Sequence, residues 1–343
     1  MNGLLKTTIA GSLPKPLWLA EPLQLWPKWH FEGEALLQAQ HDATALAIRE
    51  QERAGIDIVS DGEQARQHFV TSFLEGLEGV DGANKKSVLL RDRYEGLVPV
   101  VKGPLARRKP VFVDIARFAR EQTSRQLKFT LPGPLTLVDS LFDEFYHDRE
   151  KLAHEFAVIL NAEAREIAAR GIDVIQFDEP AFNIEKLFDD VAKWGVSTLE
   201  HAAAGLSCKT AVHICYGYGI KPNIDWKRSL GQEWRQYEKI FPLIASSPLT
   251  QVSLECHNSK VPIELLELLS SKELLVGSID VASEIIETPE EVAKTIRKAL
   301  KYANPEKVFP CTNCGMAPLQ REVAYAKLRS LTAGAAIVRR DFE

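Results

Sequence analysis

Eight short apolar runs, separated by longer segments with helical spacing, constrain the fold of this chain more than any other feature of its sequence. The runs cover residues 7–12, 55–60, 127–131, 172–177, 210–215, 251–255, 274–279 and 307–311. Residues 34–53 and 151–170 carry apolar side chains at helical spacing, and Gly171 follows as a helix-ending glycine. Because parallel neighbouring strands need a crossover, usually a helix, this alternation predicts an α/β protein with a single (β/α)8 TIM barrel.

The segment between the second and third runs does not fit the alternation. Residues 98–104 read as one arm of a β-hairpin, so we expect a hairpin insertion there, at roughly residues 76–120. A doubly wound sheet is the competing architecture, but no Gly-x-Gly-x-x-Gly follows the first run. No linker rich in Gly, Ser or Pro interrupts the chain, and we expect one domain over residues 1–343.

Charge and cysteine content exclude several classes of protein. With 42 Lys+Arg against 47 Asp+Glu and no basic cluster, we expect no nucleic acid and no membrane surface as partner. The chain begins without a basic and then apolar signal, and no stretch approaches ~18 apolar residues, so we expect a cytoplasmic protein. Five cysteines are few for a chain of this length, and an odd number cannot all pair. This argues against a disulfide framework and favours free or metal-bound thiolates.

Polar or turn-forming residues lie at the end of every run. In a barrel of this kind the catalytic side chains lie at the C-terminal ends of the strands. In chain order these ends carry Ser12, Asp61 with Glu63, Pro132 to Pro134, Asp178 with Glu179, His213 with Cys215, Glu255, Asp280 and Cys314. We therefore expect these side chains to meet at one mouth of the barrel.

His213 and Cys215 carry the sharpest chemical signal. Residues two apart in a strand point to the same face, so the imidazole and the thiol should project together into the barrel mouth. Zinc takes about four ligands from Cys, His and carboxylates, and Glu255 and Cys314 are available at other strand ends. The pattern predicts a zinc site.

Three neighbours of these residues leave the ligand set open. Cys256 and His257 directly follow Glu255, and Cys311 precedes Cys314 in a Cys-x-x-Cys. The competing interpretation of Cys256 and Cys311 is a small buried side chain. A zinc ribbon needs a second Cys-x-x-Cys, which the sequence lacks.

Seven motifs follow one another along almost the whole chain. They are residues 9–12 (Ile-Ala-Gly-Ser), 61–63 (Asp-Gly-Glu), 133–136 (Gly-Pro-Leu-Thr), 175–181 (Ile-Gln-Phe-Asp-Glu-Pro-Ala), 213–216 (His-Ile-Cys-Tyr), 253–255 (Ser-Leu-Glu) and 313–315 (Asn-Cys-Gly). In this order they resemble the motifs of the cobalamin-independent methionine synthases, specifically the C-terminal catalytic barrel in a short, single-barrel form.

The resemblance implies a zinc-dependent methyltransferase that makes L-methionine from L-homocysteine. It implies that Zn²⁺ is bound by His213, Cys215, Glu255 and Cys314, with Gly315 favouring Cys314 over Cys311. It also implies that the amino-acid part of homocysteine is bound by Ser12, Glu63 and Asp178. The two carboxylates suit an α-ammonium group, and the turn at Ser12 can donate N–H groups to the α-carboxylate. The competing interpretation of Glu63 and Asp178 is a structural ion pair.

The sequence departs from the family where the family binds its methyl donor. The tryptophan that stacks on the pterin in the family is replaced by Ser140, and the histidine that protonates the leaving folate nitrogen is replaced by Ala282. The folate-using enzymes also carry a second barrel, for which we expect no counterpart in 343 residues. Since a tertiary amine leaves poorly without a proton, we expect a donor other than 5-methyltetrahydrofolate, such as a methylcorrinoid or its carrier protein.

Two alternative functions stay open from the sequence. The zinc chemistry could act on another small thiol or a selenol, with a corrinoid donor. From a different class, the chain could be a non-catalytic subunit that binds zinc and homocysteine for a partner protein. The presence of all four expected ligands favours the enzyme.

Overall fold

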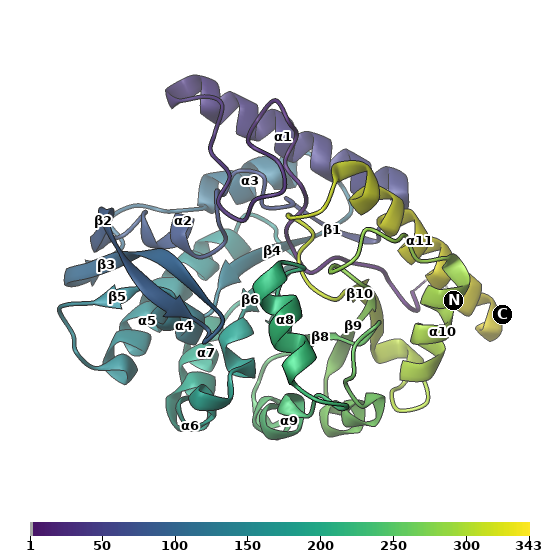
Figure 1. The fold of residues 1–343 in the computed structure, drawn as a ribbon. Coiled ribbons are helices and arrows are strands. Elements are labelled where there is room, and N and C mark those ends of the chain that lie inside the picture. The colour runs from purple at the N-terminus through teal and green to yellow at the C-terminus, as the bar shows by residue number, and fades with distance from the viewer. Residues whose placement is uncertain (1–2) are drawn as a thin grey trace.

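The computed structural model describes residues 3–343 and contains a curled parallel sheet surrounded by helices (Figure 1). The sheet has seven strands in the order β1-β4-β6-β7-β8-β9-β10, and each strand runs parallel to its neighbours. The strands are β1 (Ile58–Ser60), β4 (Gln126–Pro132), β6 (Val174–Asp178), β7 (Lys209–Ile214), β8 (Gln251–Glu255), β9 (Glu273–Ile279) and β10 (Val308–Thr312). Seven of the eight predicted strands are thereby confirmed.

The first predicted strand closes the barrel without forming a regular ladder. Thr8 makes an isolated parallel bridge with Ile58 of β1, and its N–H donates to Pro310 O of β10 at 3.0 Å. Residues 7–12 therefore lie between the two edge strands of the sheet, and the fold is the predicted TIM-type barrel.

Buried side chains replace the missing ladder bonds of this segment. Lys128 Nζ donates to Ile9 O, and Gln176 Nε2 donates to Ala10 O at 2.6 Å. The Ala10 N–H donates to Thr312 Oγ1 at 2.9 Å. Since buried backbone groups need partners, these bonds explain why the segment is extended yet is not a regular strand.

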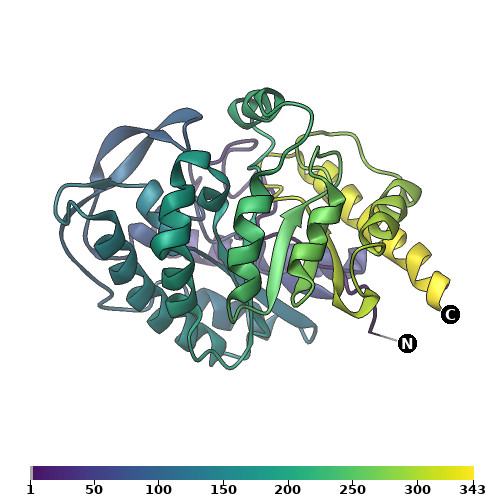
Figure 2. The same cartoon turned by 90° about the horizontal axis from the view of Figure 1, so that it is seen from below.

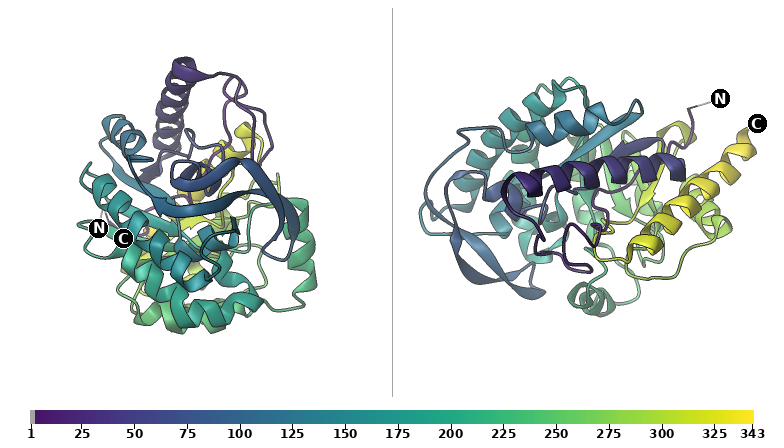
Figure 3. Two further views of the ribbon diagram at one scale, coloured as in Figure 1. Left: turned by 90° about the vertical axis from the view of Figure 1, so that its left-hand side faces the viewer. Right: turned by 90° about the horizontal axis from the view of Figure 1, so that it is seen from above.

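Eleven α-helices of the described residues surround or flank the barrel. They are α1 (Gly33–Ala54), α2 (Thr71–Leu74), α3 (Val113–Glu121), α4 (Pro134–Asp139), α5 (Arg149–Ala168), α6 (Phe188–Asp190), α7 (Val196–Ala203), α8 (Lys221–Ser229), α9 (Gln236–Ser246), α10 (Pro289–Ala299) and α11 (Arg321–Arg339). The two predicted helices are confirmed as α1 and α5, and Gly171 beyond α5 has the left-handed φ of +81°. Figure 3 shows α1 lying along α11, which brings the two ends of the chain together in the helical ring.

Among the helices of residues 3–343, none has both the length and the apolar character needed to cross a membrane.

The predicted hairpin insertion is present between β1 and β4. It consists of β2 (Glu78–Leu90) and β3 (Tyr94–Ala106), which pair antiparallel, with the short β5 (Phe142–Asp143) added alongside β3. Figure 2 shows the hairpin and α8 projecting on the same side of the barrel. The predicted range of 76–120 also takes in most of α3, which contacts α1 and α5 and so belongs to the helical ring.

A buried carboxylate anchors the chain where it returns from the hairpin to the barrel. Glu163 of α5 is fully buried and accepts the N–H groups of Val111 at 3.1 Å and Phe112 at 2.6 Å. It also forms a salt bridge with Arg107, which lies just after β3. The same arginine reaches Glu166, whose side chain is 45% exposed, at 2.9 Å.

We expect Glu163→Ala to lower the free energy of unfolding by about 3 kcal/mol, because it leaves a partly buried guanidinium and two backbone N–H groups without their partner. Urea denaturation monitored by circular dichroism measures this change. The matched control is Glu166→Ala, which removes an exposed pair with the same arginine and should cost at most about 1 kcal/mol. Equal losses of unfolding free energy in the two variants would show that the buried salt bridge stabilises the fold no more than the exposed one.

Candidate active site

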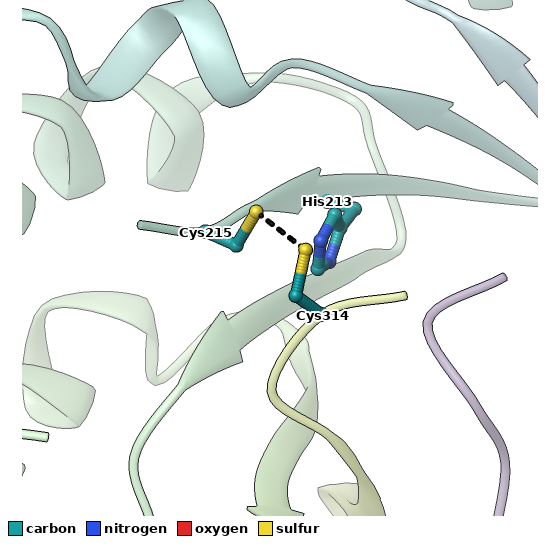
Figure 4. A group of neighbouring side chains, drawn as sticks. All are labelled: His213, Cys215 and Cys314. Atoms are coloured by element: carbon teal, nitrogen blue, oxygen red, sulfur yellow. Dashed lines mark hydrogen bonds between the residues drawn. The ribbon is translucent and has the colours of Figure 1, made fainter. Parts of the chain in front are cut away.

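His213, Cys215 and Cys314 converge at the mouth of the barrel where the strands end (Figure 4). His213 lies in β7, Cys215 directly follows that strand, and Cys314 lies two residues beyond β10. Their ligand atoms are all within 4.8 Å of one another, and all three side chains are buried. The two sulfur atoms are 3.2 Å apart. The structure thus brings together three of the four predicted metal ligands.

The surroundings of the cluster orient the His213 imidazole and favour a negative charge on Cys215, both of which suit a cation. His213 Nδ1 lies 2.8 Å from Ser253 Oγ of β8, which orients the ring, while its buried Nε2 has no partner within residues 3–343. A hydrogen bond with the Cys314 thiol lowers the pKa of Cys215 well below its usual value. The same hydrogen bond, together with burial, raises the pKa of Cys314. The cluster therefore favours a thiolate at Cys215, whose charge raises the pKa of the neighbouring His213 against the effect of burial.

Glu255, the fourth predicted ligand, is at the end of β8 but is not part of the cluster. Its carboxylate forms a buried salt bridge with Lys227 of α8 at 2.7 Å. Its second oxygen accepts the N–H of Tyr216 at 3.3 Å. The lysine gives this buried charge a partner in place of a metal ion.

The neighbouring residues that left the ligand set open lie outside the cluster. His257 Nδ1 is 2.8 Å from Thr295 Oγ1 of α10, and His257 is not in the His/Cys/Cys cluster of residues 3–343. Burial raises the pKa of both Cys256 and Cys311. Both thiols are therefore held in their neutral form, as small buried side chains are.

Ser12, Glu63 and Asp178 line the same pocket as the metal cluster. The pocket encloses about 360 Å³ and is lined by Ala10, Gly11, Ser12, Glu63, Phe69, Arg91, Asp178, Pro180, His213, Cys215, Gly217, Tyr218, Cys314 and Gly315. The backbone N–H groups of Gly11 and Ser12 donate to no acceptor within residues 3–343. They form a pair of free donors at the pocket wall, suited to a carboxylate.

The two carboxyl groups of the pocket form no salt bridge within residues 3–343, although His213 acts electrostatically on Asp178 and Arg66 acts on Glu63. Glu63 accepts from Thr130 Oγ1 at 3.0 Å, and Asp178 accepts from Gln176 Nε2 at 2.8 Å. Burial, reinforced by the charge of Glu63, raises the pKa of Asp178 to about 7. Burial likewise raises the pKa of Glu63.

The cation that acts most on Glu63 is already engaged elsewhere. Arg66 forms a buried salt bridge with Asp61 at 2.7 Å. The competing interpretation of Glu63 and Asp178 as members of a structural ion pair therefore finds no partner among the salt bridges of residues 3–343. Two carboxylates without a cation make the pocket attractive to an ammonium group.

Three side chains in or beside the pocket were not singled out from the sequence. Arg91 and Tyr218 line the pocket, and Lys227 holds Glu255. Arg91 lies in the turn between β2 and β3. The Arg-Asp-Arg sequence of this turn is the only local pattern that could have pointed to it. No local pattern marks Lys227 or Tyr218, because their partners come from distant segments.

The positions that depart from the family follow two different elements, α4 and β9. Ser140 ends α4 and is buried with its hydroxyl unpartnered within residues 3–343. Ala282 follows β9 and packs against the loop that follows β7. A Cβ on Gly219 of that loop would lie 2.2 Å from Val281 O and 2.6 Å from Ala282 Cα, so only glycine permits this approach.

Comparison with known proteins places the chain in a family. The family described as cobalamin-independent synthase, catalytic domain, matches residues 5–231 and 233–336. A methionine synthase of Saccharolobus solfataricus is 33% identical over 344 residues, covering 99% of this chain and 96% of that protein. One of Sulfolobus acidocaldarius is 32% identical over 342 residues, covering 99% and 94%.

A solved structure agrees with the sequence relatives. The B12-independent methionine synthase of Shewanella sp. W3-18-1, in complex with selenomethionine, is 59% identical and covers 99% of both chains with a TM-score of 0.97. The corresponding putative enzyme of Listeria monocytogenes, at 18% identity and a TM-score of 0.71, shares the fold. The chain therefore belongs to the cobalamin-independent methionine synthase family, whose catalytic domain its barrel forms.

Proposed function

We propose that this protein is a zinc-dependent methyltransferase that converts L-homocysteine to L-methionine. The observation that carries the proposal is a single buried pocket containing a His/Cys/Cys cluster beside two carboxylates that lack a cation. Each part of the acceptor, namely thiol, ammonium and carboxylate, has a complementary group in that pocket.

The donor set fits Zn²⁺. Imidazole nitrogen and thiolate sulfur are the ligands that zinc prefers, and the buried, unpartnered Nε2 of His213 is available for a metal bond. In the proposed site His213, Cys215 and Cys314 bind the ion, and Glu255 completes the set by exchanging its bond with Lys227. When bound, zinc lowers the pKa of a coordinating thiol so that homocysteine presents a thiolate at neutral pH.

The side chains of the pocket hold the amino-acid part of the substrate. The carboxylates of Glu63 and Asp178 receive the α-ammonium group. The free N–H groups at Gly11 and Ser12 receive the α-carboxylate. Held at this end, the substrate directs its thiol towards the cluster, and the gain in rate comes from fixed proximity and orientation.

The methyl donor in this proposal is not 5-methyltetrahydrofolate. Ala282 offers no proton to a leaving amine, and Ser140 offers no ring for a pterin. When a methylcorrinoid gives up its methyl group, the corrinoid leaves as a cobalt(I) species and needs no proton. The two substitutions therefore do not slow transfer from this donor. The Shewanella relative is described as B12-independent. A corrinoid donor is therefore tested beside other donors and is not assumed.

The same relative was solved with selenomethionine, an analogue of the proposed product. This complex favours an amino-acid acceptor over the alternative of another small thiol or a selenol.

The first prediction concerns the metal. We expect about one Zn²⁺ per chain, and Cys215→Ser or Cys314→Ser should remove most of it because each loses one of only about four ligands. Plasma mass spectrometry after dialysis measures the content. Cys311→Ser and Cys208→Ser are the matched controls and should stay near the wild-type content. Normal zinc in the Cys314 variant would contradict the proposed ligand set.

The second prediction uses L-methionine, whose thioether carries no titrating proton. Because the pKa of Asp178 is about 7, lowering the pH from 8 to 6 protonates this carboxyl and removes charge facing the ammonium group. The affinity should fall about 10-fold over this range, since one pKa unit corresponds to a factor of ten. Isothermal titration calorimetry measures it, with zinc content checked at each pH.

The control for this prediction is Asp178→Asn. The variant should bind methionine about 10- to 150-fold more weakly at pH 8, the value of a hydrogen bond to a charged group, and should lose the pH dependence. Glu63→Gln should weaken binding to a similar extent with zinc retained. A wild-type affinity that stays constant between pH 6 and 8 would show that Asp178 does not contact the ammonium group.

The third prediction concerns the donor. Zinc-loaded protein and L-homocysteine are incubated with 5-methyltetrahydrofolate or methylcobalamin, and methionine is measured by chromatography. Turnover with the folate should be negligible, because a general acid contributes about 10²–10⁴-fold and Ala282 cannot supply it. Folate-dependent turnover near the ~10 s⁻¹ of ordinary enzymes would overturn this part of the proposal. Homocysteine binding without turnover from any donor would favour the non-catalytic subunit.

A further inference from the structure

Arg91 is a buried cation that forms no salt bridge within residues 3–343, and its guanidinium carbon lies 5.8 Å from the centroid of the Phe69 ring. Its side chain is only 5% exposed, and it makes no hydrogen bond and no salt bridge within residues 3–343. Its backbone and that of Asp92 have the left-handed φ angles of +52° and +55°, which non-glycine residues seldom adopt. These angles are usual in a tight hairpin turn and fix the direction of the side chain, while a desolvated charge without a salt-bridge partner is costly and persists where a ligand uses the group.

The side chain of Arg91 lies at the junction of two spaces. It lines the metal pocket, and it also lines an outer cleft of about 810 Å³, more than twice the 360 Å³ of the pocket. The outer cleft is bounded by the tip of the hairpin, by the short helix η2 (Glu185–Leu187) and by α8. Figures 1 and 2 show the hairpin and α8 rising on the same side of the barrel.

A second guanidinium group lies in the wall of the outer cleft. Arg93 stacks on Trp226 of α8, with its central carbon 3.3 Å from the ring centroid. Its Nη1 donates to Tyr216 O at 3.3 Å and to Asn223 Oδ1 at 3.2 Å, while its Nε and Nη2 have no partner within residues 3–343. Asp92, which is paired with Lys186, and Glu185 also line the cleft, so the unused donors of the two arginines are the part of the wall suited to an anion.

The amino-acid acceptor does not account for these arginines. In the proposed function its carboxylate is bound by the turn at Ser12 and its ammonium group by Glu63 and Asp178. Its thiol is directed to the metal cluster, so no charged group of homocysteine is left for Arg91. The second substrate of a methyl transfer must approach the thiol, and the outer cleft is the large space that adjoins the pocket at Arg91.

We propose that the outer cleft is the methyl donor's binding site and that Arg91, assisted by Arg93, binds an anionic phosphate or carboxylate group of the donor. The assignment rests on the proposed function. It identifies the donor by its chemistry: a molecule larger than an amino acid that carries a negative charge near its methyl-bearing end.

One acidic group competes for the role of partner to Arg91. Asp139, at the end of α4, acts on Arg91 electrostatically, yet the two form no salt bridge within 4.0 Å and Asp139 Oδ2 is itself buried without a partner. If the arginine existed to pair with this carboxylate, removing it would destabilise the fold. If it exists to bind a ligand, removing it would relieve an unpaired buried charge.

Stability separates these two roles. We expect Arg91→Gln to unfold at the wild-type temperature or above in calorimetry, because it removes an uncompensated buried charge. The matched control is Arg66→Gln, an equally buried arginine whose guanidinium pairs with Asp61 and Thr130, and it should lower the unfolding temperature. A loss of stability in Arg91→Gln as large as that of the control would overturn the proposal.

Binding tests the ligand class directly. Inorganic phosphate and succinate are titrated separately into zinc-loaded protein by calorimetry, which distinguishes a phosphate from a carboxylate site. We expect one of them to bind, Arg91→Gln to weaken it about 10-fold or more, and Arg93→Gln to weaken it as well, as for hydrogen bonds between charged groups. Arg117→Gln, on exposed surface of α3, should leave the affinity unchanged.

L-Methionine is titrated into the same variants, so that this inference and the proposed function can fail separately. Arg91 also lines the acceptor pocket, so the two losses are compared: Arg91→Gln should weaken the binding of the anion by a larger factor than the binding of methionine, because no charged group of the amino acid is assigned to Arg91. A loss of methionine affinity as large as the loss of anion affinity would assign Arg91 to the amino acid and overturn the inference, with the proposed function intact. No anion binding to the wild type would also overturn it. Failure of the wild type to bind methionine would instead contradict the proposed function.

Discussion

The bonds that buried side chains make to the backbone of residues 8–12 determine where the rest of the site lies. Lys128, Gln176 and Thr312 take up the polar groups of Ile9 and Ala10, so the segment closes the barrel without a ladder. Just beyond, the N–H groups of Gly11 and Ser12 are left free at the mouth. The Met316 N–H donates to Ser12 O at 2.8 Å, which ties this turn to the loop that carries Cys314. The first and last segments of the barrel therefore hold the acceptor site together.

The pocket keeps charges that the fold alone does not neutralise. Glu63 and Asp178 lack a cation, the imidazole Nε2 of His213 lacks a partner, and Arg91 lacks an anion. Around them, Arg66 with Asp61 and Lys227 with Glu255 are paired in the ordinary way for buried charges. Buried charges without a partner lower the stability of the folded state. Here they lie in the pocket, as is typical of sites where ligands bind. In the proposed function and the further inference, these groups bind two substrates, an amino acid in the pocket and an anionic molecule in the outer cleft.

The acceptor side and the donor side of the mouth differ in how closely they follow the family. The acceptor side is built from strand ends, whose positions the barrel dictates. The proposed donor side is built from the hairpin tip, η2 and α8, which the barrel does not constrain. Loops of this kind can change between relatives without disturbing the core, so the barrel does not restrict the proposed site to one methyl donor.

Local patterns in the sequence determined the barrel, the hairpin and the meeting of His213, Cys215 and Cys314, because strand alternation and motif order are properties of short segments. They also predicted the helices α1 and α5 and the pocket position of Ser12, Glu63 and Asp178. Only the tertiary structure showed that residues 7–12 bond through side chains, that α3 belongs to the ring, and that Lys227 holds Glu255. It alone brought Arg91 from the hairpin to the metal pocket. Each of these features depends on contacts between residues tens of positions apart or more. Such contacts in a closed barrel produce no repeating pattern in the sequence from which they could be predicted.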